Sequence, residues 1–488
     1  MSPAQIASIL DENQSLRDEV ADLTSQLEWF RRQVFGTKSE RFVAPDCQTT
    51  LELAVEPAQA AAQTQRISYE RTRPAKQTPH GREEIPAHLP RKEFELLPPD
   101  DISGMERIGQ KVTEQLEYLP AQMFVTRYVR PVFAGDVDGV RKVVCAELPP
   151  LCSDKGKFGP SMVAHVTVAK YEDHTPVHRQ RKQILRDSGV DVAESSLDKL
   201  PEIAATWLDI IARRCREEVL ASGYAQMDES HIQVMIKPTN GKSTTGQMWL
   251  MHSPEKRIVV FDYDRHRSAE VARRLLKGYE GILQTDGYVV YNAYNKAPGI
   301  VHAGCHAHAR RGFDESLGND KVLATHVLCE YRKLFDIEEL ARQAAMTPEQ
   351  RLALRLEKTA PIMAELKAWL DTQLRKVQPR GPIGTAIRYT LNQWTQLTRC
   401  LEDGRIELSN NFVENCVRPL ALGRKNWLFA GCEDAARRAA TIYTVLNTCR
   451  LHGVNSFEYL TDVLQKLPTR KASDIDDLLP WNWVASQK

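Results

Sequence analysis

The sequence has no apolar run near the roughly 20 residues that a helix needs to cross a bilayer, so it does not predict a membrane protein. Its start lacks the basic region and the small-residue cleavage site of an export signal. No two of its 10 cysteines have the C-x-x-C spacing of a zinc or redox site. We therefore expect a cytoplasmic protein whose cysteines are mostly reduced and buried.

An excess of charge is also missing, since 65 lysines and arginines face 64 aspartates and glutamates, which gives a formal net charge of +1. Any affinity for nucleic acid must therefore come from local basic patches. With 488 residues the chain is too long for a single compact core, and this length predicts about three domains.

A heptad repeat occupies the start of the chain. Position a holds Ile6, Asn13, Val20, Leu27 and Val34, and position d holds Ile9, Leu16, Leu23 and Phe30. A single asparagine among apolar a positions sets the register of a two-stranded coiled coil. We therefore expect residues 1–42 to form a zipper that holds a homodimer or a higher oligomer. One amphipathic helix packed on its own chain is the alternative.

Three further regions precede residue 223. Residues 43–95 are rich in Ala, Gln, Thr and Pro and predict a linker. Residues 107–148 alternate apolar and polar side chains, which predicts a small antiparallel β domain over 96–158. Residues 159–222 show helical patterns joined by tight turns. They resemble a helix-turn-helix whose second helix begins near Ser195 or Ser196, with a plain helical bundle as the alternative.

From residue 223 the pattern changes to strands. The runs "YAQMD", "HIQVMI", "GQMWLMHS" and "RIVVFDYD" precede a helix, and the strands "GILQTD" and "GIVHAG" follow it. This order predicts a ribonuclease H-like α/β core over 223–320, interrupted by an all-helical insertion over 321–403 and completed by a helix in 404–450. A C-terminal tail, 451–488, follows, and the fold class as a whole is multidomain α+β.

Three acids are placed so that this fold would gather them. Asp228 lies in the first strand, Asp286 at the end of the fourth, and Glu414 on the helix after the insertion. The first and fourth strands of a ribonuclease H-like sheet are neighbours, so the sequence predicts one pocket with three carboxylates. Such oxygen ligands bind Mg²⁺, and two ions about 4 Å apart catalyse displacement at phosphodiesters.

Other interpretations of these acids stay open. Asp286 and Gly287 form an Asp-Gly turn signal. Asp262 and Asp264 are rival acids on a neighbouring hairpin, and Glu407 is a rival for the third place. Without metal, clustered carboxylates would raise one another's pKa.

The segments "MDES", "LQTDGYVVYNAY", "CHAHARRGF" and "NNFVENCVRPLALGRKNWLFAG" closely resemble the DDE transposases of the insertion sequence 66 family, in its large subunit. "FGTKSERF", "GPSMVAHVTVAKYEDHTPVHRQ" and "FEYLTDVLQKLP" extend the resemblance over nearly the whole chain. It implies that Asp228, Asp286 and Glu414 are the catalytic and metal-binding triad, with two Mg²⁺ ions or Mn²⁺ as a substitute. It also implies that the partners are the element's terminal inverted repeats, the target DNA that receives its 3′-hydroxyl ends, and accessory proteins of the same element.

The chain departs from that family where a zinc finger is usual. The family's two C-x-x-C pairs are replaced by "LPPDDISG" and "FAGDVDG". The acids in these segments are poor zinc ligands; they are Asp100, Asp101, Asp136 and Asp138. We therefore expect residues 96–158 to form a degenerate, zinc-free relative of the finger.

Two smaller departures are His306 in place of a tryptophan and Ser409 in place of an aspartate. They leave a second interpretation open, in which the chain is a catalytically degenerate or domesticated relative that binds DNA ends or represses transcription. A repair nuclease or RNA-directed nuclease on the same fold is a third interpretation.

Cys305 and His308 are three positions apart on one expected helix. We expect this pair to support the fold, because two ligands do not make a zinc site. Several basic residues are candidates for contacts with DNA phosphates, with surface salt bridges as the equal alternative. They are His308, Arg310, Arg311, Arg418, Arg424, Lys425, Arg437 and Arg438.

Overall fold

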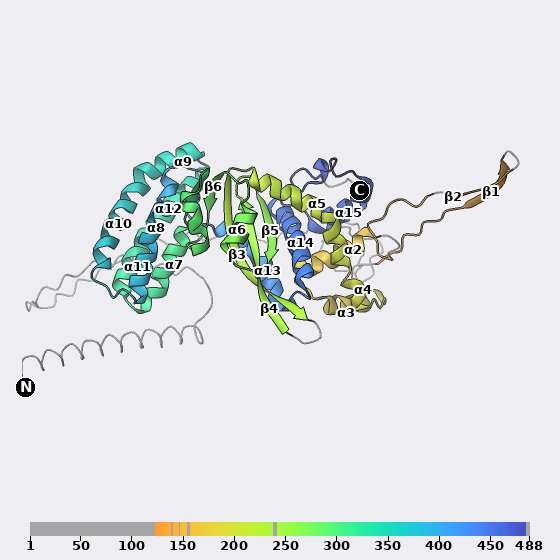
Figure 1. Ribbon diagram of the computed structural model, residues 1–488, viewed down its shortest axis with the longest axis horizontal. Coiled ribbons are helices and arrows are strands. Elements are labelled where there is room, and N and C mark those ends of the chain that lie inside the picture. The colour runs from red at the N-terminus through yellow and green to blue at the C-terminus, as the bar shows by residue number, and fades with distance from the viewer. Residues whose placement is uncertain (1–122, 138–139, 146, 154–156, 238–241, 485–488) are drawn as a thin grey trace, which may run out of the picture. The chain divides into compact units, whose positions relative to one another are not determined.

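A mixed sheet of five strands organises the computed structural model in Figure 1. The structure describes residues 123–137, 140–145, 147–153, 157–237 and 242–484. The expected zipper and linker lie outside these residues. The chain divides into two units, and the unit made of Met1–Thr49 and Val125–Lys488 contains nearly all that is described.

The first three strands of the sheet are antiparallel, and the last two run parallel to the first. They are β3 (Tyr224–Lys237), β4 (Lys242–Ser253), β5 (Ile258–Asp264), β6 (Gly281–Gln284) and β7 (Ile300–Ala303). Their spatial order is β5-β4-β3-β6-β7. As predicted, the strand with Asp228 lies beside the strand that leads to Asp286. "YAQMD" and "HIQVMI" form one strand, because the register with β4 continues to Met235.

Helix α14 (Glu433–Leu451) closes the free edge of the sheet at β5. The N–H of Phe261 donates to Thr444 Oγ1 at 2.9 Å, and the N–H of Val259 donates to Thr448 Oγ1 at 3.4 Å. The two threonines are one helical turn apart, so α14 supplies acceptors along an edge that would otherwise be open to a further strand. These bonds fix the helix against the sheet.

The helices before the sheet share its hydrophobic core. They are α2 (Pro160–Tyr171), α3 (Val177–Ser188), α4 (Glu194–Leu197) and α5 (Leu200–Leu220). The long helix therefore begins after the expected start near Ser195 or Ser196, where only the four-residue α4 is found. Leu208 and Ile211 of α5 are fully buried, so one face of this helix packs on the core.

The segment expected as a C-terminal tail, 451–488, contains a helix that packs on the core. Helix α15 (Ser456–Lys466) buries Leu460 and Val463 in the same core as the sheet. Tyr459 donates its hydroxyl to the carbonyl of Leu478 at 2.7 Å. Apolar residues at helical spacing in "FEYLTDVL" explain this packing, since together they form one buried helix face.

A second hydrophobic core lies in the helical insertion. Its elements are α8 (Lys321–Gln343), α9 (Pro348–Leu354), the π-helical turn η4 (Arg355–Thr359), α10 (Ala360–Leu374), α11 (Pro382–Asn392), α12 (Trp394–Thr398) and η5 (Arg399–Leu401). All are helical, as the sequence predicts. The preceding helix α7 (His306–Glu315) and the sheet residues Tyr224 and Ile282 belong to the same core. The insertion therefore packs on the strands next to the candidate acids.

The remaining described elements are short, apart from one helix. They are the hairpin β1 (Val132–Val137) and β2 (Val140–Cys145), α6 (Ala269–Leu275), η2 (Val289–Lys296), η3 (Ser316–Gly318), α13 (Asn411–Trp427), η6 (Leu467–Thr469) and η7 (Asp476–Leu478). The hairpin is the described part of the expected antiparallel β domain. In the described ranges, no helix is both long enough and apolar enough to span a membrane.

Candidate active site

Three carboxylates from separate segments interact beyond the carboxyl end of β6, beside the first half of the central strand β3. Asp228 lies in β3, Asp286 lies two residues beyond β6, and Glu414 lies in the first turn of α13. The pKa of Asp228 is raised to about 8, first by burial and then by the negative charges of Glu229, Asp286 and Glu414. The N–H of Glu229 donates to Asp228 Oδ1 at 2.8 Å and partly opposes this rise. The structure thus brings the three predicted acids within electrostatic reach of one another.

Asp286 forms a local turn and also interacts electrostatically with Asp228. Asp286 Oδ1 accepts a hydrogen bond from the N–H of Tyr288 at 3.0 Å. The N–H of Gly287 donates to the hydroxyl of Tyr389, on α11 of the insertion, at 3.1 Å. A Cβ at position 287 would collide with Tyr389, so glycine permits this close approach. The turn interpretation of Asp-Gly is therefore correct locally, and it is compatible with the interaction of Asp286 with Asp228.

Glu414 lies near an imidazole, that of His308, and a guanidinium, that of Arg311, without a direct hydrogen bond to either. Its Oε1 is 3.6 Å from His308 Nε2, and its Oε2 is 3.7 Å from Arg311 Nη2. Glu414 Oε1 is buried and accepts no hydrogen bond from any described residue. A buried carboxylate oxygen without a donor is costly, and a cation would satisfy it.

The donor chemistry of this site fits a hard divalent cation. Carboxylate oxygens are the protein ligands that Mg²⁺ and Mn²⁺ favour, and a cation would relieve the repulsion that raises the pKa of Asp228. However, no group of three or more His, Cys, Asp and Glu side chains within the described ranges is close enough to hold a metal ion. The acids would therefore have to move closer together when an ion binds.

A fourth acid, which the sequence did not single out, is buried beside the first. The side chain of Glu229 is only 2% exposed. Tyr291 donates its hydroxyl to Glu229 Oε2 at 2.7 Å, and Arg267 Nε donates to Glu229 Oε1 at 2.7 Å. Burial raises the pKa of Glu229, and these two donors partly oppose the rise. The guanidinium of Arg267 also stacks on the ring of Tyr288, 3.8 Å from its centroid. The only signal in the sequence was a second acid directly after Asp228.

Tyr291→Phe should destabilise the protein by about 1.5–3 kcal/mol, because it removes a hydrogen bond to a buried charged group. Urea denaturation would measure the free energy of unfolding. Tyr294→Phe is the matched control on the same short helix, since Tyr294 is also buried and its hydroxyl has no hydrogen-bond partner in the part of the chain that is described. An equal effect of the two substitutions would contradict the role given to the Tyr291 hydroxyl.

The rival acids are bound in other ion pairs. Asp262 accepts from Arg216 at 3.1 Å and from Arg274 at 3.0 Å, and Asp264 pairs with Arg274 at 3.1 Å. Both lie on the edge strand β5. Glu407 accepts two hydrogen bonds, at 2.8 and 2.7 Å, from Arg351 of the insertion. The charge of each rival is therefore compensated by an arginine.

Of the predicted pair, Cys305 lies in the core and His308 lies at the candidate site. Cys305 is 3% exposed, just before α7, and burial raises the pKa of its thiol to about 12. Burial lowers the pKa of His308, and the charge of Glu414 partly opposes this. His306, also buried, hydrogen-bonds the carbonyl of Leu397 through Nε2 at 3.0 Å. The cysteine therefore behaves as a packing residue, whereas His308 faces the acids.

Not all of the candidate DNA-binding cations are available for phosphates. Arg424 donates to Ser230 Oγ at 2.8 Å and to the carbonyl of His231 at 2.6 Å, so it fixes α13 to β3. Arg437 forms ion pairs with Glu433 and Asp434. Arg438 forms an ion pair with Glu202. Arg311, Arg418 and Lys425 are exposed; Arg311 lies 3.7 Å from Glu414, Arg418 is one turn after Glu414 on α13, and Lys425 is in the last turn of that helix.

Comparison with known proteins places this arrangement in a family. Residues 155–438 match the family described as "Transposase IS66 family", and residues 444–481 match the "IS66 C-terminal element". Residues 22–94 match "Transposase C of IS166 homeodomain", and residues 101–134 match the "zinc-finger binding domain of transposase IS66".

Similar chains occur in Sinorhizobium fredii (strain NBRC 101917 / NGR234). Its uncharacterised protein y4qI is 32% identical over 98% of this chain and 92% of its own length. The uncharacterised protein y4hP is 29% identical over 95% of this chain and 89% of its own length. The family matches and these full-length similarities agree. The chain belongs to the IS66 family of transposases.

Proposed function

We propose that the chain is a DNA transposase that uses Asp228, Asp286 and Glu414 to hold divalent metal ions while it cuts and joins DNA. The observation that carries this proposal is the interaction of three carboxylates from separate segments, which together with burial raises the pKa of Asp228 to about 8. Membership of the IS66 family supports transposition as the general activity. The proposed substrates are the terminal inverted repeats of an insertion sequence and the target DNA that receives the 3′-hydroxyl ends.

The sheet supports a ribonuclease H-like catalytic core. Its order sets two parallel strands beside the first of three antiparallel ones, which is the arrangement that the DDE assignment requires. Helix α13, which carries Glu414, contacts β3 and β4. One acid therefore comes from the central strand, one from the loop after its parallel neighbour, and one from a helix packed on the sheet.

The side chains around the acids have distinct proposed tasks. Two divalent ions, when bound, would activate the attacking oxygen and stabilise the leaving oxygen of a phosphodiester. Asp228 would release its proton as an ion binds, because metal ligands must be deprotonated. Arg311 attracts the carboxylate of Glu414 by charge at 3.7 Å, and the imidazole of His308 lies 3.6 Å from the same carboxylate. Arg418 and Lys425 would contact DNA phosphates and fix the register of the duplex.

Two parts of the proposal concern segments that lie wholly or partly outside the described ranges. We expect the zipper over residues 1–42 to hold a homodimer or higher oligomer, and we expect residues 96–158 to fold without zinc. The segment that matches the family's zinc finger, 101–134, contains no cysteine. The same observation favours the second candidate function, a degenerate relative that binds the ends of the element without cutting them.

Cleavage of DNA that contains the element's ends, in the presence of Mg²⁺, tests the proposal. Asp286→Asn and Glu414→Gln should each lower the cleavage rate by at least about 100-fold, because each removes a charge that holds a metal ion. Asp264→Asn is the control, since Asp264 lies on the edge strand β5 and its carboxylate pairs with Arg274. Full activity of either triad variant would refute the assignment, and binding of the ends without cleavage by the wild-type protein would favour the non-catalytic candidate.

A further inference from the structure

Two buried glutamines lie side by side in the sheet, each two residues before a candidate catalytic aspartate. Gln226 of β3 and Gln284 of β6 are fully buried and form the last register pair between these strands. Gln226 Nε2 donates to Gln284 Oε1 at 2.9 Å, and Tyr224 donates its hydroxyl to the same oxygen at 2.7 Å. Buried polar partners of this kind fix the register of a sheet, because a slip would leave them unpaired.

The same glutamines hold the loop that leads to α13. Gln284 Nε2 donates to the carbonyl of Glu407 at 2.6 Å and to the carbonyl of Gly304 at 3.0 Å. Gln226 Nε2 donates to the carbonyl of Ser409 at 3.2 Å. One set of hydrogen bonds therefore joins β3, β6 and the loop before α13. These are the three segments that carry the candidate triad.

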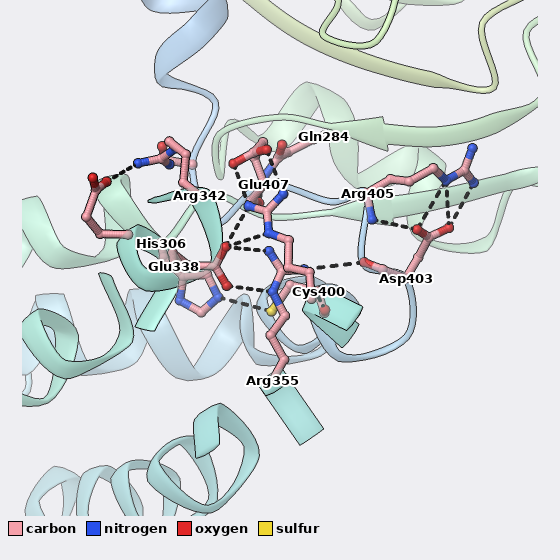
Figure 2. A network of polar contacts seen from close by, with 12 residues as sticks. Gln284, His306, Glu338, Arg342, Arg355, Cys400, Asp403, Arg405 and Glu407 are labelled. Carbon is pink, nitrogen blue, oxygen red and sulfur yellow. Dashed lines mark hydrogen bonds and ion pairs between the residues drawn. The ribbon is translucent and has the colours of Figure 1, made fainter. Parts of the chain in front are cut away.

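An ion-pair network in the insertion holds this loop from its other side, as Figure 2 shows. Arg351 of α9 donates to the carboxylate of Glu407 at 2.8 and 2.7 Å and to Glu338 of α8 at 2.8 Å. Arg355 is fully buried and donates to Glu338 at 2.6 and 2.9 Å. The position of Glu407, and with it that of Gln284, therefore depends on the folded insertion.

We infer that Gln284 is a positioning residue for the acidic site and that the insertion acts on the site through it, an inference that rests on the proposed function. Hydrogen bonds that hold the segments bearing metal ligands change metal affinity or activity by about 10–100-fold when they are removed. The described acids must still move closer together to hold an ion. The bonds of Gln284 hold the three segments together, so that the acids start this movement from neighbouring positions.

The substitution Gln284→Met tests this role, because it keeps the length of the side chain and removes the amide oxygen and the amide nitrogen. The carbonyls of Glu407 and Gly304 then lose their donor. We expect the affinity of the full chain for Mn²⁺, followed through the electron paramagnetic resonance signal of the free ion, to fall about 10-fold or more. The kcat for cleavage of end-containing DNA should fall with it, while KM for that DNA stays within about 3-fold of the wild-type value.

The matched control is Gln180→Met. Gln180 lies on α3, is 1% exposed, and its Nε2 also donates to two carbonyls, those of Val166 and Thr175, at 3.3 and 2.8 Å. It should lose similar stability but bind Mn²⁺ like the wild-type protein. Wild-type Mn²⁺ affinity in Gln284→Met, or an equal loss in Gln180→Met, would overturn the positioning role.

A second variant decides the question if Gln284→Met does not fold. Tyr224→Phe removes the hydroxyl that donates to Gln284 Oε1 and accepts from the N–H of Glu407 at 3.1 Å. A smaller loss of Mn²⁺ affinity in the same direction supports the role, and unchanged affinity refutes it. Asp286→Asn separates the two proposals: if it binds Mn²⁺ like the wild-type protein, the proposed function fails. If it loses Mn²⁺ while the Gln284 and Tyr224 variants keep it, only the positioning role fails.

Discussion

Replacing Asp228 with asparagine should abolish DNA cleavage and at the same time stabilise the metal-free protein. Asparagine keeps an oxygen that can accept the hydrogen bond from the N–H of Glu229, which reaches Asp228 Oδ1 at 2.8 Å. It removes the ionisable group from a position surrounded by other acids. Because the lost carboxylate would neutralise a divalent cation during catalysis, we expect cleavage to fall by at least about 1000-fold.

The gain in stability follows from the pKa of Asp228, which burial and the neighbouring negative charges raise from 3.8 to about 8. The unfolded chain loses this proton at a lower pH than the folded protein does. The contribution of Asp228 to stability is therefore complete below the unfolded pKa and is lost as the pH rises to about 8. Across that window the wild-type protein should lose up to about 1.4 kcal/mol of unfolding free energy per pH unit relative to Asp228→Asn.

Urea denaturation in EDTA, repeated between about pH 5 and about pH 8, would measure this difference. Asp264→Asn provides the control, because the carboxylate of Asp264 pairs with Arg274 at 3.1 Å and its removal should not stabilise the protein. The explanation fails if the wild-type and Asp228→Asn curves run parallel over this range. The proposed catalytic role fails separately if Asp228→Asn still cleaves DNA.

The order of strands and helices could be predicted from the sequence because it depends on local periodicity. The apolar runs in "RIVVFDYD" and "GILQTD" correspond to β5 and β6, and the helical spacing after residue 320 corresponds to α8 through α12. Packing, in contrast, depends on residues far apart in the chain. The packing of α15 within the expected C-terminal tail could not be predicted for this reason, since its partners in the core include α2, about 290 positions earlier in the sequence.

The proximity of the two aspartates could also be predicted, because Asp286 follows the apolar run of β6 and Asp228 lies on the neighbouring strand β3. Their supporting residues could not. Glu229 looks like an ordinary acid in a strand, and its donors Arg267 and Tyr291 are 38 and 62 positions away. Gln284 lies in a run that looks apolar, and its link to Glu407 spans 123 positions. Such pairs show no local periodicity, so only the folded chain identifies them.

Glu338→Gln should destabilise the helical insertion by about 3–5 kcal/mol, because it leaves a buried arginine without its counter-ion. Arg355 is fully buried, and Glu338 is 3% exposed. Without the carboxylate, the remaining acceptors of Arg355 are the carbonyls of Cys400 at 3.0 Å and Asp403 at 3.4 Å. These dipoles do not neutralise the charge. Arg351 still pairs with Glu407 at 2.7 Å, so most of the lost stability comes from the unpaired charge of Arg355.

The ion pair of Glu338 and Arg355 should also affect how the stability of the wild-type protein depends on pH. Burial raises the pKa of Glu338, but the hydrogen bonds and charges of Arg355 and Arg351 outweigh it, so the pKa lies below the ordinary value of 4.5. The stability that this group contributes is therefore present above pH 4.5 and is lost as the pH falls through the lower pKa of the folded state. Acid denaturation of Glu338→Gln should lack this component.

The neighbouring substitution Glu339→Gln is the matched control for the loss of stability. Glu339 is one residue further along α8, its side chain is 49% exposed, and it pairs with Arg342 on the surface. Its replacement should change the free energy of unfolding by less than about 1 kcal/mol. The double variant Glu338→Gln with Arg355→Met should be more stable than Glu338→Gln alone, because it removes the unpaired buried charge as well. A double variant that is less stable than both single variants would show that burial of a lone charge is not what destabilises Glu338→Gln.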